Sequence, residues 1–161
     1  MTEKSENTVL TLERFLPYRL SILSNKISSM VASAYQDKFA LTITEWRIMA
    51  VLGEFPGVSA DEISAKTQIE KSILSRSVNR LLKRHLIERE ISDVDRRRSH
   101  IRLSEMGAAV YEEIVPLSLQ YEKALLECFN TDEKQQLSGL IDRLYQHCQS
   151  LPDAPKERVE G

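Results

Sequence analysis

The sequence is poor in the residue types on which several protein classes depend. Its 161 residues contain only 2 cysteines, too few for the disulfide framework of a small secreted protein. Glycine and proline number 5 each, which excludes collagen-like chains and disfavours a glycine-rich phosphate loop. No apolar run is long enough to span a bilayer. The N-terminal segment also lacks the pattern of a secretory signal, in which an apolar segment follows a basic start. These absences favour a cytoplasmic protein with no membrane partner.

Catalytic and metal-binding motifs are lacking as well. The sequence has no His-Glu-x-x-His, Gly-x-Ser-x-Gly, P-loop or Gly-x-Gly-x-x-Gly motif, and its 3 histidines are scattered. His147 and Cys148 are neighbours on an expected helix, where successive side chains point about 100° apart, so they do not form a joint pair of metal ligands. We therefore expect a protein that is not an enzyme and needs no cofactor or metal.

Positive charge is concentrated in one segment, although the chain as a whole is slightly acidic. Lys and Arg total 22 against 24 Asp and Glu, which gives a net charge of −2. Between Lys71 and Leu103, 10 basic and 4 acidic residues give a net charge of +6, whereas the remainder has 12 basic and 20 acidic residues and a net charge of −8. A basic patch of this kind is typical of a nucleic-acid-binding surface.

Helical periodicity marks both ends of the chain. Apolar residues at spacings of three and four predict a long amphipathic helix from Leu12 to about Phe39, which Pro17 bends or restarts near its beginning. A second long helix is predicted from Glu105 to about Phe129, with a kink at Pro116. Thr131 is expected to cap a last helix. The apolar stripe of that helix contains Leu137, Leu140, Ile141, Leu144, Tyr145 and Cys148.

Three short helices are expected in succession between these ends. Thr42 with Glu45, and Ser59 with Glu62, have the spacing of capping boxes, in which each side chain bonds to the backbone N–H of the other residue. Each box opens a short helix, and a third helix is predicted from about Glu70 to Arg84. Their succession is a tri-helical pattern.

A β-hairpin with a charged tip is predicted after the third helix. Residues 86–91 and 99–103 alternate between apolar and polar side chains, and the run 92–98 between them is polar. Ser104 then caps the next helix. The tip carries Asp95, Arg96, Arg97 and Arg98.

One face of the third helix combines short polar and basic side chains. Leu74, Val78 and Leu81 follow one another at helical spacing and must face the core. Hydroxyl groups on the opposite face can donate to phosphates, Arg76 can pair with a guanine edge, and Asn79 can bind an adenine edge. The alternative is a solvated face without a partner. The polar face consists of Ser72, Ser75, Arg76, Asn79 and Lys83.

The arginines of the hairpin tip strengthen the interpretation of a DNA-binding surface. Arg96, Arg97 and Arg98 are adjacent and repel one another unless a polyanion is present. An arginine on such a projection can enter a narrow minor groove, where the potential is most negative. Asp95 can orient one guanidinium group through a bidentate pair. The alternative is an exposed charged turn without a partner.

The order of these features resembles the MarR family of winged helix-turn-helix regulators. The resemblance covers about residues 10–150, and its most specific part is an Asp-x-Arg wing signature followed by an alternating strand and a Ser-x-x-Gly helix start. The matching segments are Leu41-Thr42-Ile43-Thr44-Glu45-Trp46-Arg47, Ser72-Ile73-Leu74-Ser75-Arg76, Leu86-Ile87-Glu88-Arg89, Asp95-Arg96-Arg97 and Leu103-Ser104-Glu105-Met106-Gly107.

This resemblance implies a mainly α fold with a small β-hairpin wing. Residues 41–104 would form the winged helix-turn-helix DNA-binding region, residues 1–40 and 105–150 a helical dimerisation region, and 151–161 a flexible tail. The implied partner of the homodimer is a pseudo-palindromic double-stranded DNA operator. The matching recognition-helix residues are Ser72, Ser75, Arg76, Asn79 and Arg80, and the matching wing residues are Asp95 and Arg97.

His85 is the one visible departure from the family pattern. Members of the family usually have glycine after the recognition helix, where this chain has His85. Unless the helix ends differently, His85 must adopt the left-handed backbone conformation with some strain. The angle of the wing depends on how this turn is made.

A small-molecule effector is a further implication of the resemblance. Such regulators commonly act as repressors that leave DNA when an aromatic or phenolic carboxylate, or a thioester of one, binds in a cleft. Candidate lining residues are Tyr18, Arg19, Ser28, Trp46 and Arg47, because an arginine beside an aromatic wall can clamp a carboxylate. Core packing of Trp46 and structural salt bridges of the two arginines are the alternatives.

Two other interpretations of the whole chain stay open. It could be a winged-helix protein-interaction scaffold without DNA binding, since the fold can lose that function and keep its core. It could also be a repressor controlled by oxidation of Cys128 or Cys148. Peroxide-sensing members of the family that it resembles use a cysteine near the N-terminal helix, and this chain has none there. Steep weakening of DNA binding by salt would distinguish a regulator from a scaffold.

Overall fold

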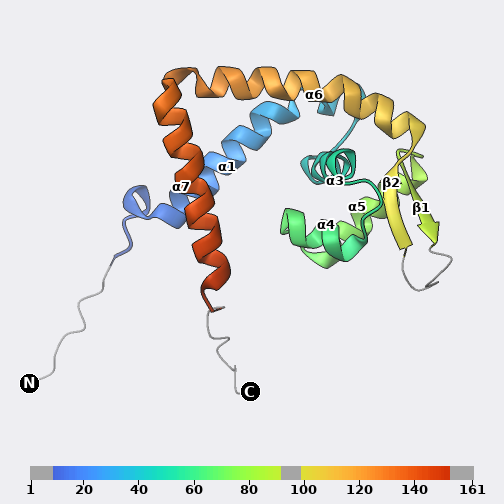
Figure 1. Ribbon diagram of the computed structural model, residues 1–161, viewed down its shortest axis with the longest axis horizontal. Coiled ribbons are helices and arrows are strands. Elements are labelled where there is room, and N and C mark those ends of the chain that lie inside the picture. Colours follow the sequence, from blue (N-terminus) through green and yellow to red (C-terminus); the bar gives the residue numbers. More distant parts are fainter. Residues whose placement is uncertain (1–8, 92–98, 153–161) are drawn as a thin grey trace, which may run out of the picture. The chain divides into compact units, whose positions relative to one another are not determined.

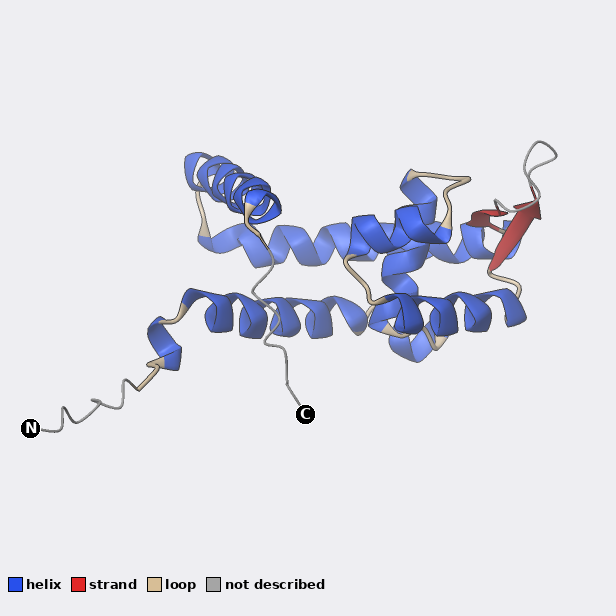
Figure 2. Cartoon of the chain, turned by 90° about the horizontal axis from the view of Figure 1, so that it is seen from below, coloured by secondary structure: helices blue, strands red, loops and turns tan. Residues whose placement is uncertain are grey.

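The computed structural model describes residues 9–91 and 99–152, and it is mainly helical with one small β-hairpin (Figures 1 and 2). Its contacts divide the chain into two compact units, Met1–Tyr121 and Glu122–Gly161. None of the helices in the described ranges combines the length and the hydropathy that crossing a bilayer requires. The elements are η1 (Leu12–Arg14), α1 (Leu16–Ala32), α2 (Gln36–Phe39), α3 (Ile43–Glu54), α4 (Ala60–Thr67), α5 (Lys71–Lys83), β1 (Ile87–Ile91), β2 (Ser99–Leu103), α6 (Glu105–Leu125), η2 (Leu126–Cys128) and α7 (Thr131–Ser150).

The predicted N-terminal helix is wrong as a single element, because residues 12–39 form η1, α1 and α2. Of the two predicted roles of Pro17, the structure shows a restart and not a bend: Pro17 lies in the first turn of α1, where a missing backbone N–H costs nothing. The break after α1 begins at Ser33, whose hydroxyl donates to the carbonyl of Met30 at 2.7 Å. It allows Tyr35 to be buried, with its ring 5.6 Å from that of Trp46.

Both predicted capping boxes are confirmed. Thr42 Oγ1 accepts the N–H of Glu45 at 3.1 Å, and Glu45 Oε2 accepts the N–H of Thr42 at 2.9 Å, so the start of α3 is fixed. The same reciprocal bonds join Ser59 and Glu62 at the start of α4. These local signals place α3 and α4 before α5, as the tri-helical pattern predicts.

The turn between α5 and β1 uses the left-handed conformation expected for His85. Its φ is +56°, the N–H of His85 bonds to Leu82, and the N–H of Leu86 bonds to Leu81. These two bonds satisfy carbonyls at the end of α5 as a Schellman motif does. Ser104 fastens the start of α6 to this turn, because its hydroxyl donates to the carbonyl of His85 at 2.6 Å and accepts the N–H of Gly107 at 2.9 Å.

The hairpin is antiparallel, as the alternation predicts. Ile87 pairs with Leu103, and Arg89 pairs with Ile101, so one face of β1 and β2 presents Ile87 and Ile101 to the core. A bridge between Val58 and Ile101 joins the hairpin to the turn after α3. The hairpin is therefore joined both to the turn after α3 and, through the turn at His85, to the end of α5.

One continuous core lies within the unit Met1–Tyr121. Ile48, Met49, Ile63, Leu81 and Ile101 are fully buried and come from α3, α4, α5 and β2. Among the described residues, two buried side chains of the core region are polar. They are Glu45 and Ser77.

The unit Glu122–Gly161 begins within α6 and contains η2 and α7. Pro116 lies inside α6 rather than ending it, but the helix stops at Leu125 instead of reaching Phe129. The cap of α7 is Asn130 and not Thr131 as predicted: Asn130 Oδ1 accepts the N–H of Glu133 at 2.9 Å, and Glu133 Oε2 accepts the N–H of Asn130. An amide oxygen caps as well as a hydroxyl does, so both residue types fitted the pattern.

Candidate nucleic-acid interface

The polar face predicted on α5 is exposed. Leu74, Val78 and Leu81 are buried, as the spacing requires, and they anchor α5 against the core. The opposite side consists of small polar and basic groups that a flat, rigid partner can approach closely. Its exposed members are Ser72, Ser75, Arg76, Asn79 and Lys83.

Two groups at the start of this face already have intramolecular partners. Glu70 caps α5: its carboxylate accepts the N–H of Ser72 at 3.0 Å and also the hydroxyl of Ser72. These bonds, the hydroxyl first, lower the pKa of Glu70. Nε of Arg76 donates to the carbonyl of Ser72 at 3.3 Å. Because Nε forms that bond, the two terminal amino groups of Arg76 are the ones that can contact a base edge.

Arg80 differs from the other basic residues of α5. Its Nε donates to Oε1 of Glu45 at 2.8 Å, and a terminal amino group donates to the hydroxyl of Ser77 at 3.1 Å. The Glu45 side chain is only 3% exposed, whereas that of Arg80 is 52% exposed. Burial alone would raise the pKa of Glu45, but the Thr42 N–H and the Arg80 guanidinium outweigh it and hold that pKa below its usual value.

A small hollow of about 100 Å³ lies beside the polar face of α5. Side chains of α4, α5 and β1 line it, among them Lys71, Ser75 and Arg89. Lys71 is paired with Asp61 of α4 at 3.1 Å, and both side chains are largely exposed, so the pair contributes little to stability. The hollow thus adds Arg89 to the polar face, together with Lys71, whose charge Asp61 balances.

Arg89 is a candidate that the sequence reasoning missed. The count of charges between Lys71 and Leu103 includes Arg89 but assigns it to no surface. In the hairpin register it pairs with Ile101 and shares the face of Ile87, yet it is exposed. The period of two in β1 could have placed it on the side of the hairpin that faces α5.

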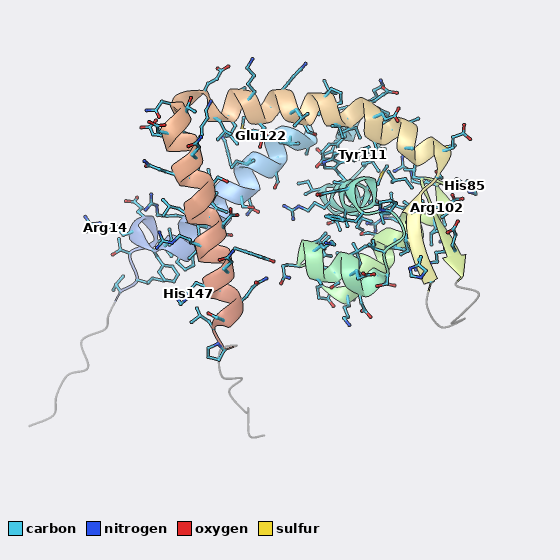
Figure 3. The ribbon with its side chains drawn as sticks, viewed as in Figure 1. Arg14, His85, Arg102, Tyr111, Glu122 and His147 are labelled. Carbon is cyan, nitrogen blue, oxygen red and sulfur yellow. The ribbon has the colours of Figure 1, made fainter. Side chains whose placement is uncertain are left out.

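The other face of the hairpin carries a small ion-pair network. Arg102 donates from Nε to Glu88 at 2.9 Å and from a terminal nitrogen to Glu90 at 2.7 Å. Figure 3 shows Arg102 on the hairpin and His85 at the turn that precedes it. Because two carboxylates surround Arg102, this face adds no positive charge. The predicted tip residues Asp95, Arg96, Arg97 and Arg98 lie outside the described residues.

The five candidate ligand residues fall into two groups. Arg47 donates to the hydroxyl of Ser28 at 3.0 Å, and Trp46 lies between Tyr35 and Tyr111 with ring separations of 5.6 and 5.8 Å. Figure 3 shows Tyr111 on α6 near α3. Burial raises the pKa of the Tyr35 phenol, and the charge of Arg47 opposes this rise.

Tyr18 and Arg19 lie on α1 away from Ser28, Trp46 and Arg47. They line an open groove of about 470 Å³ together with Leu16, Leu20, Ile22, Leu23 and Lys26. Tyr18 is ten residues from Ser28 along the same helix, a distance of about 15 Å at 1.5 Å per residue. Within one described chain, the five candidates therefore do not line a common pocket.

The arrangement of a helix-turn-helix followed by a β-hairpin defines a winged helix. Comparison with known proteins agrees with this fold. A sequence model of the MarR family matches residues 41–98. A crystal structure of a MarR/EmrR family transcriptional regulator from Acinetobacter sp. ADP1 is 32% identical, covers 88% of this chain and 100% of that chain, and has a TM-score of 0.81.

Two further proteins are similar to the chain, one in sequence and one in fold. The chain is 25% identical to the HTH-type transcriptional regulator BilQ of Clostridium symbiosum (strain WAL-14163). The similarity extends over 133 residues, which are 83% of this chain and 92% of BilQ. It is similar in fold to BpsR of Bordetella bronchiseptica, with 19% identity, coverage of 86% and 98%, and a TM-score of 0.75. That structure concerns the regulation of BpsR's DNA binding by 6-hydroxynicotinic acid.

The chain belongs to the MarR family of transcriptional regulators, which are DNA-binding proteins without enzymatic activity. The predicted family, the mainly helical fold with a two-stranded wing and the expectation of a protein that is not an enzyme are thereby confirmed. The roles of individual site residues stay predictions.

Proposed function

We propose that the protein is a homodimeric repressor that binds a pseudo-palindromic DNA operator and leaves it when a small aromatic carboxylate binds. The observation that carries the proposal is the exposed polar and basic face of α5, held on a buried core by Leu74, Val78 and Leu81. In this function α5 lies in the major groove. Arg76 and Asn79 read base edges, while Lys83 and Arg89 contact phosphates.

The wing completes the proposed interface. In the sequence, the run Asp95-Arg96-Arg97-Arg98 lies between β1 and β2, and these two strands pair in a defined antiparallel register. Arg97 is proposed to enter the minor groove beside the major-groove site of α5. A substitution of Arg97 by alanine is then expected to weaken binding to all sequences alike, because a minor-groove arginine responds to shape and potential more than to base identity.

Apolar surface in each unit supports the proposed homodimer. In the first unit, Leu16, Leu20 and Leu23 of α1 are 43–53% exposed. In the second unit, Leu140 and Ile141 of α7 are 56–58% exposed on one helix face. Stripes of large apolar side chains are unfavourable in water, and burial against a second copy would remove them from it.

An aromatic carboxylate is proposed as the effector on chemical grounds. The charge of Arg47 acts on the Tyr35 phenol, whose ring lies 5.6 Å from that of Trp46, and a guanidinium beside aromatic rings can bind the carboxylate of an aromatic acid. BpsR, a relative in fold, is regulated by 6-hydroxynicotinic acid, which is itself an aromatic carboxylic acid. Arg19 lies on α1 and would join this site only if a second copy supplied it.

The proposal is tested by selecting bound fragments from random duplex DNA with the purified protein. We expect a palindrome whose half-site centres lie about 10 base pairs apart, because two α5 helices must reach successive major grooves on one side of the duplex. Lengthening the spacer by about half a helical turn should abolish this binding. Binding that ignores the spacing would contradict the dimeric arrangement.

Release is tested on the selected duplex with a panel of aromatic carboxylic acids and their thioesters. The expected result is loss of the complex with one compound, and retention of the complex when Arg47 is replaced by alanine in the presence of that compound. A reporter gene placed behind the selected sequence then gives the sign of regulation. Failure to enrich any sequence at low salt with a folded dimer would instead favour a protein-interaction scaffold.

A further inference from the structure

Arg80 lies on the recognition helix but is oriented toward the protein. In α5 it follows the fully buried Ser77 by three positions, so it sits at the edge of the buried face rather than at the centre of the exposed one. Its guanidinium group donates to both Glu45 and Ser77. Arg76 and Lys83, by contrast, have no salt-bridge partner among the described residues.

The partner of Arg80 is itself fixed in place. Oε2 of Glu45 accepts the N–H of Thr42 at 2.9 Å, and Oε1 accepts Nε of Arg80 at 2.8 Å, so each carboxylate oxygen has a partner. Glu45 is 3% exposed and belongs to the first turn of α3, which the capping box holds. A buried carboxylate that loses its cation is strongly disfavoured, so this contact fixes how far and at what angle α5 lies from α3.

We propose that Arg80 is a positioning residue that seats the recognition helix through Glu45 and does not bind DNA phosphates. This revises the sequence-based expectation that Arg80 contacts DNA, and it rests on the proposed DNA-binding function. The charge of Arg80 is neutralised by a carboxylate that DNA cannot displace, because Glu45 is buried. Sequence specificity depends on the Arg80–Glu45 contact, because the base-reading side chains of α5 must be aligned with the base edges in the groove.

The experiment measures the affinity for the selected duplex and for random duplex as a function of salt concentration. Each cation that contacts a phosphate contributes about 0.9 to the slope of log K against log salt. Arg80→Gln is expected to leave that slope unchanged. Lys83→Gln, the matched control at an exposed cation of the same helix, is expected to reduce the slope by about 1.8, because the proposed dimer loses one phosphate contact from each of its two copies.

Glu45→Gln distinguishes the two roles most sharply, because they predict opposite results. A positioning role predicts that the ratio of specific to random affinity falls about tenfold, comparable to one mismatched base pair. A phosphate-contacting Arg80 would instead be released by this change, so binding to both duplexes would stay the same or tighten. The double variant Glu45→Gln, Arg80→Gln should lose no more specificity than the worse single variant, because both changes remove one contact.

The folded fraction of each variant is fixed by circular dichroism and stoichiometric titration before affinities are compared. A purely stabilising role would lower both affinities together, and the ratio would not change, which would overturn the proposal. A reduced slope for Arg80→Gln, equal to that for Lys83→Gln, would overturn it as well while leaving the proposed function intact. If the unmodified protein bound no DNA in a salt-dependent way, the proposed function and this inference would both fail.

Discussion

The winged helix-turn-helix and α7 bury their apolar side chains very differently. In the first, Met49, Ile63 and Ile101 are fully buried, and they come from α3, α4 and β2. In α7, all of whose residues are described, none is buried, and Leu140 is 58% exposed. The winged helix therefore forms its core within one chain, whereas a helix with an unburied apolar stripe depends on a partner for most of its stability.

The packing around two glycines differs in the same way between the two regions. A Cβ added to Gly107 at the start of α6 would lie 1.8 Å from the carbonyl oxygen of Leu86, because α6 meets the α5–β1 turn backbone to backbone. A Cβ added to Gly139 in α7 would have no neighbour within 4 Å. Close packing has made one glycine indispensable and left the other replaceable.

The largest expected effect comes from charging the α7 stripe. Ile141→Lys should convert the proposed dimer into a monomer, since a lysine buried without a partner at the dimer interface is unfavourable. Loss of two-site binding should weaken the affinity for the selected duplex by about a hundredfold or more. Light scattering coupled to gel filtration and fluorescence anisotropy measure the two effects.

Gln146→Lys is the control for that change, because Gln146 lies on the opposite side of α7 from the stripe. It should preserve both the dimer and the affinity. If Ile141→Lys also preserved them, α7 would not contribute to the dimer, and the contrast between the two regions would need another explanation.

Replacement by alanine should change the free energy of unfolding in opposite directions at two glycines. Gly107→Ala should lower the free energy of unfolding by about 1–3 kcal/mol, because the added methyl group overlaps the backbone of Leu86. Gly139→Ala should raise it by about 0.5–1 kcal/mol through helix propensity alone. Urea unfolding followed by circular dichroism compares them. Equal effects would mean that the α6–turn contact is not close.

Arg76→Ala tests whether the polar face of α5 reads sequence. It should cost about 1–3 kcal/mol of binding free energy on the selected duplex and relax the preference at one base pair, as a bidentate guanine contact would. Lys83→Ala should weaken binding to every duplex alike. Anisotropy titrations with single-base variants of the site separate the two outcomes. An equal loss on random DNA would show that Arg76 is not a base reader.

Glu45 gives the winged helix a dependence on pH that α7 lacks at its stripe. Because its folded-state pKa lies below the ordinary value of 4.5, its contribution is complete above that pH and is lost as the pH falls through the folded-state pKa. Glu62 and Glu70 shift in the same direction, so the difference between the unmodified protein and Glu45→Gln isolates Glu45. In unfolding titrations that difference should shrink as the pH falls below 4.5. A difference that stayed constant would mean that Glu45 is not charged in the folded protein.

The smallest expected effect is a gain in stability from His85→Gly. His85 has a φ of +56°, where a side chain is strained by about 1 kcal/mol, and glycine removes the strain. Thermal unfolding should show a modest increase in midpoint. Lys83→Gly, two residues earlier within α5, should lower the midpoint instead because it weakens the helix. A decrease for both would indicate that the imidazole of His85 makes a compensating contact.

The sequence predicted the elements that local bonds determine. The capping boxes of α3 and α4 involve residues three positions apart, so their spacing alone identifies both helix starts. The same rule left two residues open at the start of α7, where Asn130 rather than Thr131 has the extended conformation of a cap. The exposed face of α5 also followed from periodicity, because a buried row at helical spacing fixes the opposite side.

The candidate site was less predictable where residues far apart in the sequence meet. Arg80 and Glu45 are 35 positions apart, and no periodic pattern connects them. Arg84 is similar, since its guanidinium donates to the carbonyls of Phe39 and Ala40 at the end of α2. Counting charges treated both arginines as part of one basic patch, whereas their contacts show that each has a partner within the protein.

The sequence by itself determined where α3 and α4 begin, where the hairpin lies and which face of α5 is exposed. These features depend on bonds and spacings within a few residues, and such interactions are encoded where they act. Only the tertiary structure decided that the N-terminal helix breaks to bury Tyr35, that Gly107 must be glycine and that Arg80 faces Glu45. Each of these depends on packing between distant segments, whose distances no local pattern specifies.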